Sequence, residues 1–363
     1  MATPIDLATR QQVYLERLKA GFERTWRQGP QIDLRDSARK MLTALEVDTM
    51  QGLTKSQLNA LLARLGDAHV DIAMKGMLEF SDNLQPLSGF AAALEASTLT
   101  AFVVDTGLKF NAPTAEIAYQ FARTYPVQAT GQLLDPFIAS WPEIDVKRIQ
   151  GVVSTGWAQN KPLLTMVREV CGTRKNGYAD GALAVSERNA GAIIATSTQH
   201  TANAARMKVF ESNNDLIKGY TWISTLDRRT TPQCRSLDGR IFEAGKGPMP
   251  PLHIRCRSTT VAKLDKQFDF LDEGATRASG GPNPGPVSAD ETYYSWLKKQ
   301  PASFQDVAIG PVRGTLLRNG GLTSDRFAAL NLGRDFQPLT LREMQLLEPE
   351  AFKRAGILQS NRK

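Results

Sequence analysis

The fold of this chain is constrained most by a change in apolar periodicity at Asn213–Asn214. Before this point, apolar residues recur about every four positions, which predicts amphipathic helices. The run Tyr14, Leu18, Phe22 and Trp26 is one example, and the triplet Gln28-Gly29-Pro30 is expected to end its helix. A longer helix is expected from an N-cap at Ser186 to about Asn213.

After Asn214 the pattern becomes one of alternation. Tyr220, Trp222 and Ser224 alternate with their neighbours, which predicts a short strand. Asp238-Gly239 predicts a turn into a second strand at 240–242, with loops at 227–235 and 245–251. The chain is therefore expected to be an α+β protein. A predominantly helical body would carry a small β-hairpin module at about 216–265, followed by a helical or extended C-terminal tail.

The length of 363 residues is too great for one ordinary core. We expect an N-terminal helical region at 1–130, a central domain at 131–265, a linker at 266–290 and a helical tail at 291–363. The linker is expected because Gly, Pro, Ser and Ala dominate residues 274–290. With 42% hydrophobic and 22% charged residues, the composition is that of a globular protein.

The sequence also argues against several other classes of protein. No apolar run approaches the length that spans a bilayer, and the first residues lack the pattern of a secretory signal. The three cysteines cannot form a disulfide framework, which favours a reducing environment. We find no phosphate-binding loop, dinucleotide fingerprint or Gly-x-Ser-x-Gly elbow.

Positive charge is concentrated between Trp222 and Lys263. This segment holds eight basic and three acidic residues, which is +5 of the net charge of +7. Such an excess predicts a polyanionic neighbour, although a solvated basic face would give the same pattern. Aromatic residues are not interleaved through the segment, so binding is expected to be independent of nucleic-acid sequence. The candidate phosphate-binding residues are Arg228, Arg229, Arg235, Arg255 and Arg257.

The same segment contains a candidate zinc site. Cys234, His253 and Cys256 offer thiolate and imidazole donors, and Asp227 or Asp238 could provide the fourth ligand of a tetrahedral ion. Two packed thiols with a hydrogen-bonded histidine, or a Cys234–Cys256 disulfide, are alternatives. A Cys–His nucleophile pair is a further alternative, because it needs a thiol and an imidazole in contact.

The remaining histidines and cysteine are expected to be structural. His69 lies beside Asp67 and Asp71 and is predicted to be a surface or capping residue. His200 falls near the apolar face of its helix, and Cys171 is expected to be a small buried hydrophobe.

Several short motifs in this segment resemble those of a known family. They are Trp222-Ile223-Ser224, Asp227-Arg228-Arg229-Thr230, Leu237-Asp238-Gly239 and Pro250-Pro251-Leu252-His253-Ile254-Arg255-Cys256-Arg257. Together they resemble the phage head-morphogenesis, or Mu F-like minor head protein, domain over roughly residues 130–265. The residues expected to shape its loops are Trp222, Asp227, Thr230, Asp238, Gly239, Pro250 and Pro251. Members of that family often carry a further cysteine where this chain has Ser258. The segment from Tyr293 to Pro301 resembles extensions seen in such proteins.

The resemblance implies a minor capsid protein, assembled in the host cytoplasm and located in the virion, in the capsid interior or at the portal vertex. Its implied role is assembly of the procapsid and head. The implied partners are the portal protein, the major capsid protein or scaffold, and packaged double-stranded DNA bound without sequence specificity; no membrane is implied. We therefore expect a structural protein and not an enzyme. The alternatives are a small zinc-dependent nuclease or Cys–His hydrolase using Cys234, His253 and Cys256, and a scaffold that only bridges portal and coat.

Overall fold

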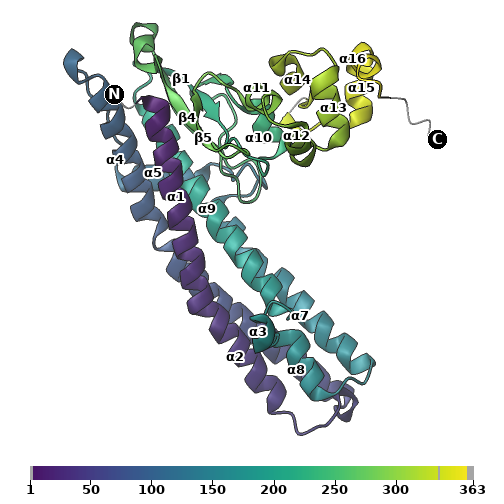
Figure 1. Cartoon of the computed structure of the whole chain (residues 1–363). Helices are drawn as coiled ribbons and strands as arrows, with labels where there is room; N and C mark the ends of the chain where they lie inside the picture. The colour runs from purple at the N-terminus through teal and green to yellow at the C-terminus, as the bar shows by residue number, and fades with distance from the viewer. Residues whose placement is uncertain (1–2, 334–335, 358–363) are drawn as a thin grey trace.

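The computed structural model describes residues 3–333 and 336–357. It consists of an elongated helical body, a small antiparallel sheet at one end of it, and a group of short C-terminal helices beside the sheet (Figure 1). The prediction of a predominantly helical α+β protein is confirmed. No helix within the described ranges is apolar over enough of its length to cross a bilayer.

The helical body contains nine α-helices. They are α1 (Pro4–Gln28), α2 (Pro30–Thr43), α3 (Lys55–Ser81), α4 (Leu84–Phe102), α5 (Ala115–Thr124), α6 (Leu134–Ala139), α7 (Trp141–Ala158), α8 (Leu163–Cys171) and α9 (Leu183–Ser212). Helix α1 begins in a capping box, in which the Thr3 side chain accepts from the Asp6 amide and Asp6 binds the Thr3 backbone in return. It ends where the sequence predicted, since Gln28 is its last residue and Pro30 opens α2.

Helix α9 is the central element of the body. Every residue from Ile193 to Met207 is buried, including the polar residues from Thr196 to Thr201, because α1, α4, α5 and the sheet pack around this part of the helix. The expected N-cap at Ser186 is wrong. The helix begins at Leu183, so Ser186 lies inside its first turns and is buried. A long helix ending near Asn213 is confirmed.

The sheet has the strand order β2-β1-β3, formed by β1 (Ile217–Ile223), β2 (Ile241–Glu243) and β3 (Thr259–Leu264). Strand β1 pairs antiparallel with both neighbours, and Tyr220 lies opposite Phe242 on one side and Ala262 on the other. The predicted hairpin of β1 and β2 is confirmed, whereas β3 was not predicted. A short helix, α10 (Pro232–Leu237), occupies part of the expected loop because Thr231 and Pro232 provide a favourable helix start.

Residues 266–290, expected to be a linker, contain ordered elements. They form a 3-10 helix (Lys266–Asp272) and a second antiparallel pair, β4 (Thr276–Ser279) with β5 (Gly285–Ser288). The Gly- and Pro-rich composition does not indicate this ordered structure. Arg277 is almost completely buried, and its guanidinium joins β4 to the Asp238 carboxylate at the end of α10. Pro286 is tolerated because this pair has only two strands.

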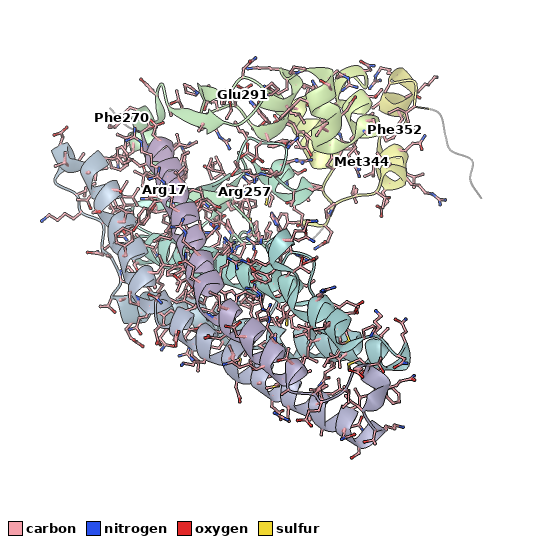
Figure 2. All side chains as sticks on the ribbon, turned by 60° about the horizontal axis from the view of Figure 1, so that its bottom comes forward. Arg17, Arg257, Phe270, Glu291, Met344 and Phe352 are labelled. Atoms are coloured by element: carbon pink, nitrogen blue, oxygen red, sulfur yellow. The ribbon has the colours of Figure 1, made fainter. Side chains whose placement is uncertain are left out.

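The C-terminal helices have a hydrophobic core of their own. They are α11 (Tyr293–Lys298), α12 (Ala302–Ile309), α13 (Pro311–Asn319), α14 (Ser324–Leu330), α15 (Leu341–Leu347) and α16 (Pro349–Arg354). Tyr294, Trp296, Phe327 and Phe352 are among the side chains buried in this core. Figure 2 shows Met344 and Phe352 within this group, apart from Arg257 of the sheet module. Residues 358–363 of the expected tail lie outside the described residues.

Candidate metal centre and adjoining pocket

Cys234, His253 and Cys256 lie together in the folded chain, although they come from different segments. Cys234 is on α10, and the other two are on the connection that leads into β3. Their candidate ligand atoms lie within 4.8 Å of one another, and the two sulfur atoms are 3.7 Å apart. Both thiols are buried, and all three cysteines of the chain are free.

The three groups perturb one another electrostatically. Hydrogen bonding to Cys256, together with burial, holds the pKa of the Cys234 thiol well above its usual range. At Cys256, burial acts to raise the pKa, but hydrogen bonds from Cys234 and His253 outweigh it and the pKa falls well below its usual range. At His253, burial acts to lower the pKa, but its interaction with Cys256 outweighs this effect and the pKa is raised. Negative charge is therefore favoured on Cys256, next to the imidazole.

Neither aspartate that was considered as a fourth ligand joins this group. The Asp227 carboxylate accepts a bidentate pair of bonds from Arg257, at 2.7 and 2.9 Å, and also binds the amides of Arg229 and Thr230. The Asp238 carboxylate binds Arg277 and the Ser224 amide. The expectation of an aspartate ligand is therefore corrected, since both carboxylates are committed to other partners.

The residues expected to shape the loops occupy such positions. The Trp222 indole is fully buried and donates to the Ser224 hydroxyl, while the Thr230 hydroxyl donates to the Thr225 carbonyl. Gly239 has a φ of 80°, in the left-handed region that favours glycine. Pro250 and Pro251 are buried and joined by a cis peptide bond.

A pocket of about 430 Å³ adjoins the cluster. Cys234 and His253 line it on one side, and α1 contributes the other wall through Glu16, Lys19 and Glu23. The Lys19 ammonium is buried and lies 3.3 Å from the Cys256 carbonyl oxygen, 2.6 Å from Glu16, and in contact with Gln199 of α9. Its pKa is lowered by burial.

The wall formed by α1 was missed by the sequence analysis. Lys19 reads as an ordinary polar position on an amphipathic helix, and it is separated from Cys256 by 237 positions. No local motif indicates such a contact.

The five candidate phosphate-binding arginines lie in different surroundings. Arg228 and Arg229 are exposed, and Arg229 lies 3.5 Å from Asp227. Arg255 pairs with Glu23 at 2.6 Å, while Arg257 is held by Asp227. Arg235 is 6% exposed and packs over the ring of Tyr293, so the expectation that it faces a polyanion is wrong. Arg235 is covered by Tyr293 of the C-terminal helices, and the charges near Arg235 in the sequence do not indicate this contact.

The other two histidines and Cys171 lie within the helical body. His69 is 4% exposed and packs edge-on against Trp141, so its expected surface position is wrong. His200 is completely buried with Nε2 2.8 Å from the Ala122 carbonyl oxygen. Burial lowers the pKa of both histidines to about 4. Cys171 is buried as expected.

The fold and site thus define a mainly helical protein with a small antiparallel sheet, beside which two buried cysteines and a half-buried histidine cluster at the edge of a pocket. Residues 164–261, which run from α8 to β3, match the family model described as phage Mu protein F like protein. The suspected Mu F-like family is therefore confirmed over this segment, and it places the segment in the phage head-morphogenesis class. Comparisons with curated proteins and with solved structures gave no match.

Proposed function

We propose that this chain is a minor head protein that acts in procapsid and head assembly near the portal, with the Mu F-like segment serving as a rigid brace. The single observation that supports this role is the way in which the segment is fixed. Its loops are held by ion pairs of Asp227 with Arg257 and of Asp238 with Arg277, and α1 is joined to it through Glu23 and Arg255. An element fixed from several directions can hold a defined spacing between larger components.

The portal protein and the major capsid protein or scaffold are the proposed partners of the brace. Co-purification with portal from assembling heads, followed by imaging of intact particles, tests this part. A protein found at the portal vertex or inside the head supports the proposal. Correct head assembly in a phage that lacks the chain would overturn it.

Contact with packaged DNA is proposed for the exposed side chains Arg228 and Arg229. Each arginine that neutralises a phosphate should contribute about 0.9 to the slope of log affinity against log salt. The double substitution Arg228→Gln with Arg229→Gln is expected to weaken DNA binding at low salt and to reduce that slope by about 1.8. Substituting Arg17 and Arg24, which are exposed on α1, gives a control with the same change in net charge.

The control variant should bind DNA like the parent chain. Equal losses in both double variants would mean that only net charge matters, and the assignment to Arg228 and Arg229 would fail. A parent chain that shows no binding at low salt would remove the DNA contact from the proposal, leaving a scaffold that bridges portal and coat.

The pocket beside Cys234 and His253 favours a second candidate, a small zinc-dependent nuclease or Cys–His hydrolase. Nuclease and esterase assays on the parent chain and on His253→Ala separate the two functions. An activity that disappears in His253→Ala, while heads still assemble, favours the enzyme. Assembly that depends on the chain, with no activity, favours the brace.

A further inference from the structure

The Sγ atoms of Cys234 and Cys256 are spaced as two ligands of one metal ion would be. A tetrahedral zinc ion bound by two thiolates at about 2.3 Å holds the sulfurs about 3.8 Å apart. The Sγ atoms of Cys234 and Cys256 are 3.7 Å apart, which is close to this spacing and far longer than a disulfide bond of about 2.05 Å. The thiols are thus already spaced as two ligands of one ion.

His253 provides a third donor, and one of its ring nitrogens is held by the backbone. Its Nδ1 lies 2.9 Å from the carbonyl oxygen of Ile254, and because a carbonyl can only accept, Nδ1 carries the proton. When a metal ion displaces the proton that His253 shares with Cys256, the second ring nitrogen is free to bind the ion, as in many zinc sites where the other nitrogen donates to the backbone. The donor atoms of all three residues lie within 4.8 Å of one another, which is close to the spacing of ligands around one tetrahedral ion.

The protein does not supply an evident fourth ligand. Asp227 and Asp238 are bound to arginines, and among the described residues the cluster contains no further histidine, cysteine or carboxylate. Cys234 and His253 instead line the pocket, which extends away from the cluster toward α1. A zinc site with three protein ligands keeps its remaining position for solvent or a ligand.

The charge of the pocket indicates which ligand it would accept. Its lining includes four cationic side chains, Lys19, Arg229, Arg255 and Arg257. Three carboxylates, Glu16, Glu23 and Asp227, pair with them, so the cations outnumber their partners by one. The lining residues include no Phe, Tyr or Trp, whereas the hydroxyl groups of Thr230, Thr231 and Ser258 are present. The surroundings favour a small oxygen anion over a flat apolar molecule.

We propose that Cys234, His253 and Cys256 bind a zinc ion whose fourth position opens into this pocket and accepts an oxygen of a carboxylate or phosphate group. The pocket is bounded by α1, so the complete site includes residues outside the Mu F-like segment. The proposal is independent of the role in head assembly, because it concerns metal content and ligand exchange in the isolated chain.

The first test measures metal in the full-length chain purified under reducing conditions. About one zinc per chain is expected, with near-complete loss in Cys234→Ser and Cys256→Ser. Cys171→Ser is the matched control, because Cys171 is buried far along the chain in α8 and is not part of the cluster. Parent protein without zinc, or equal loss in the Cys171 variant, overturns the metal site.

The second test replaces zinc with cobalt(II), whose absorption reports the number and type of its ligands. Added acetate or inorganic phosphate should shift the visible bands of the parent chain, and whichever acts at lower concentration identifies the carboxylate or phosphate source. Bands that respond to neither anion would mean a closed site and would overturn the open fourth position.

The substitution Ser258→Cys provides a complementary variant. Ser258 lines the same pocket, and its hydroxyl is one of the groups that hydrogen-bond the Cys234 thiol. A cysteine there is positioned to become the fourth ligand, so the variant should retain cobalt at least tenfold more tightly and lose its response to anions. If the variant still responds to anions as the parent chain does, the fourth coordination position does not face Ser258 and the pocket, and the proposed geometry is wrong.

Discussion

Asp238 and Arg277 form an ion pair that is almost completely removed from solvent. The Arg277 Nη1 atom lies 2.9 Å from Asp238 Oδ2, and the two side chains are 2% and 0% exposed. The pair joins the end of α10 to strand β4, which are 39 positions apart. It therefore fixes the β4–β5 hairpin to the sheet module.

Removing one partner of this pair should be strongly destabilising, because the other charge is left buried and unpaired. Arg277→Leu is expected to lower the free energy of unfolding by about 3–5 kcal/mol, measured by urea denaturation. The control is Glu243→Gln, which breaks a pair with Lys246 whose side chains are 69% and 74% exposed. The control should unfold like the parent chain, and a similar loss in both variants would contradict the argument.

The two buried histidines should make stability depend on pH. Burial lowers the pKa of His69 and His200 to about 4, from 6.5 in the unfolded chain. As the pH falls below 6.5, the unfolded state takes up protons that the folded state does not, so stability is lost. Between pH 6.5 and 5 the expected loss is about 1.5 kcal/mol for each histidine.

His200→Gln tests this prediction, because the Gln amide can still donate to the Ala122 carbonyl that His200 contacts. The free energy of unfolding of the variant should fall less steeply over this pH range than that of the parent chain. Parallel curves would show that His200 titrates normally.

The Trp222 indole fills the space beneath the Cys–His cluster, where it packs with Cys234, Leu237 and Cys256. Trp222→Ala should lower the free energy of unfolding by about 3–5 kcal/mol, since it leaves a cavity in a fully buried site. Leu346→Ala, at a position that is 76% exposed, is the control and should have little effect. A small loss in Trp222→Ala would indicate that the module collapses easily around the gap.

The C-terminal helices are attached to the Mu F-like segment partly through one hydroxyl group. Tyr293 donates to the Asp227 carbonyl oxygen at 2.7 Å, and its ring covers Arg235. Tyr293→Phe should cost about 1 kcal/mol and increase hydrogen exchange in α10 and α11. Tyr14→Phe, at a site that is 45% exposed, should leave exchange there unchanged. Faster exchange in both variants would argue against a specific role for this bond.

Periodicity predicted the elements whose residues have one buried and one exposed face. Helix α1 is of this kind, and β1 is so in part, because Lys218 is exposed and Thr221 is half-buried between buried neighbours. Strand β3 was missed because Thr259, Thr260, Val261 and Ala262 are all buried, so the alternation that indicates a strand is absent. The Gly- and Pro-rich composition near β4 concealed Arg277, whose buried ion pair with Asp238 helps to order this strand.

For the candidate site, the useful signal was that cysteine and histidine, which are rare in this chain, gather in one short segment. Two of three cysteines and one of three histidines in a short segment predicted a cluster, and the structure brings them together. The pocket could not be predicted, because Lys19 and Glu23 reach it from a helix far away in sequence. The partners of the arginines were hidden for the same reason, since counting charges does not reveal which are neutralised within the fold.

The wall that α1 contributes has a consequence for how this chain can be divided. Residues 164–261 match a family model, yet Arg277 and the Lys19 side chain lie outside those limits. A fragment cut at these limits would keep the signature motifs but leave Asp238 as a lone charge in an apolar interior. Transfer of the segment into another chain should therefore succeed only when α1 and the β4–β5 hairpin are moved with it, so the unit that folds is larger than the unit that matches in sequence.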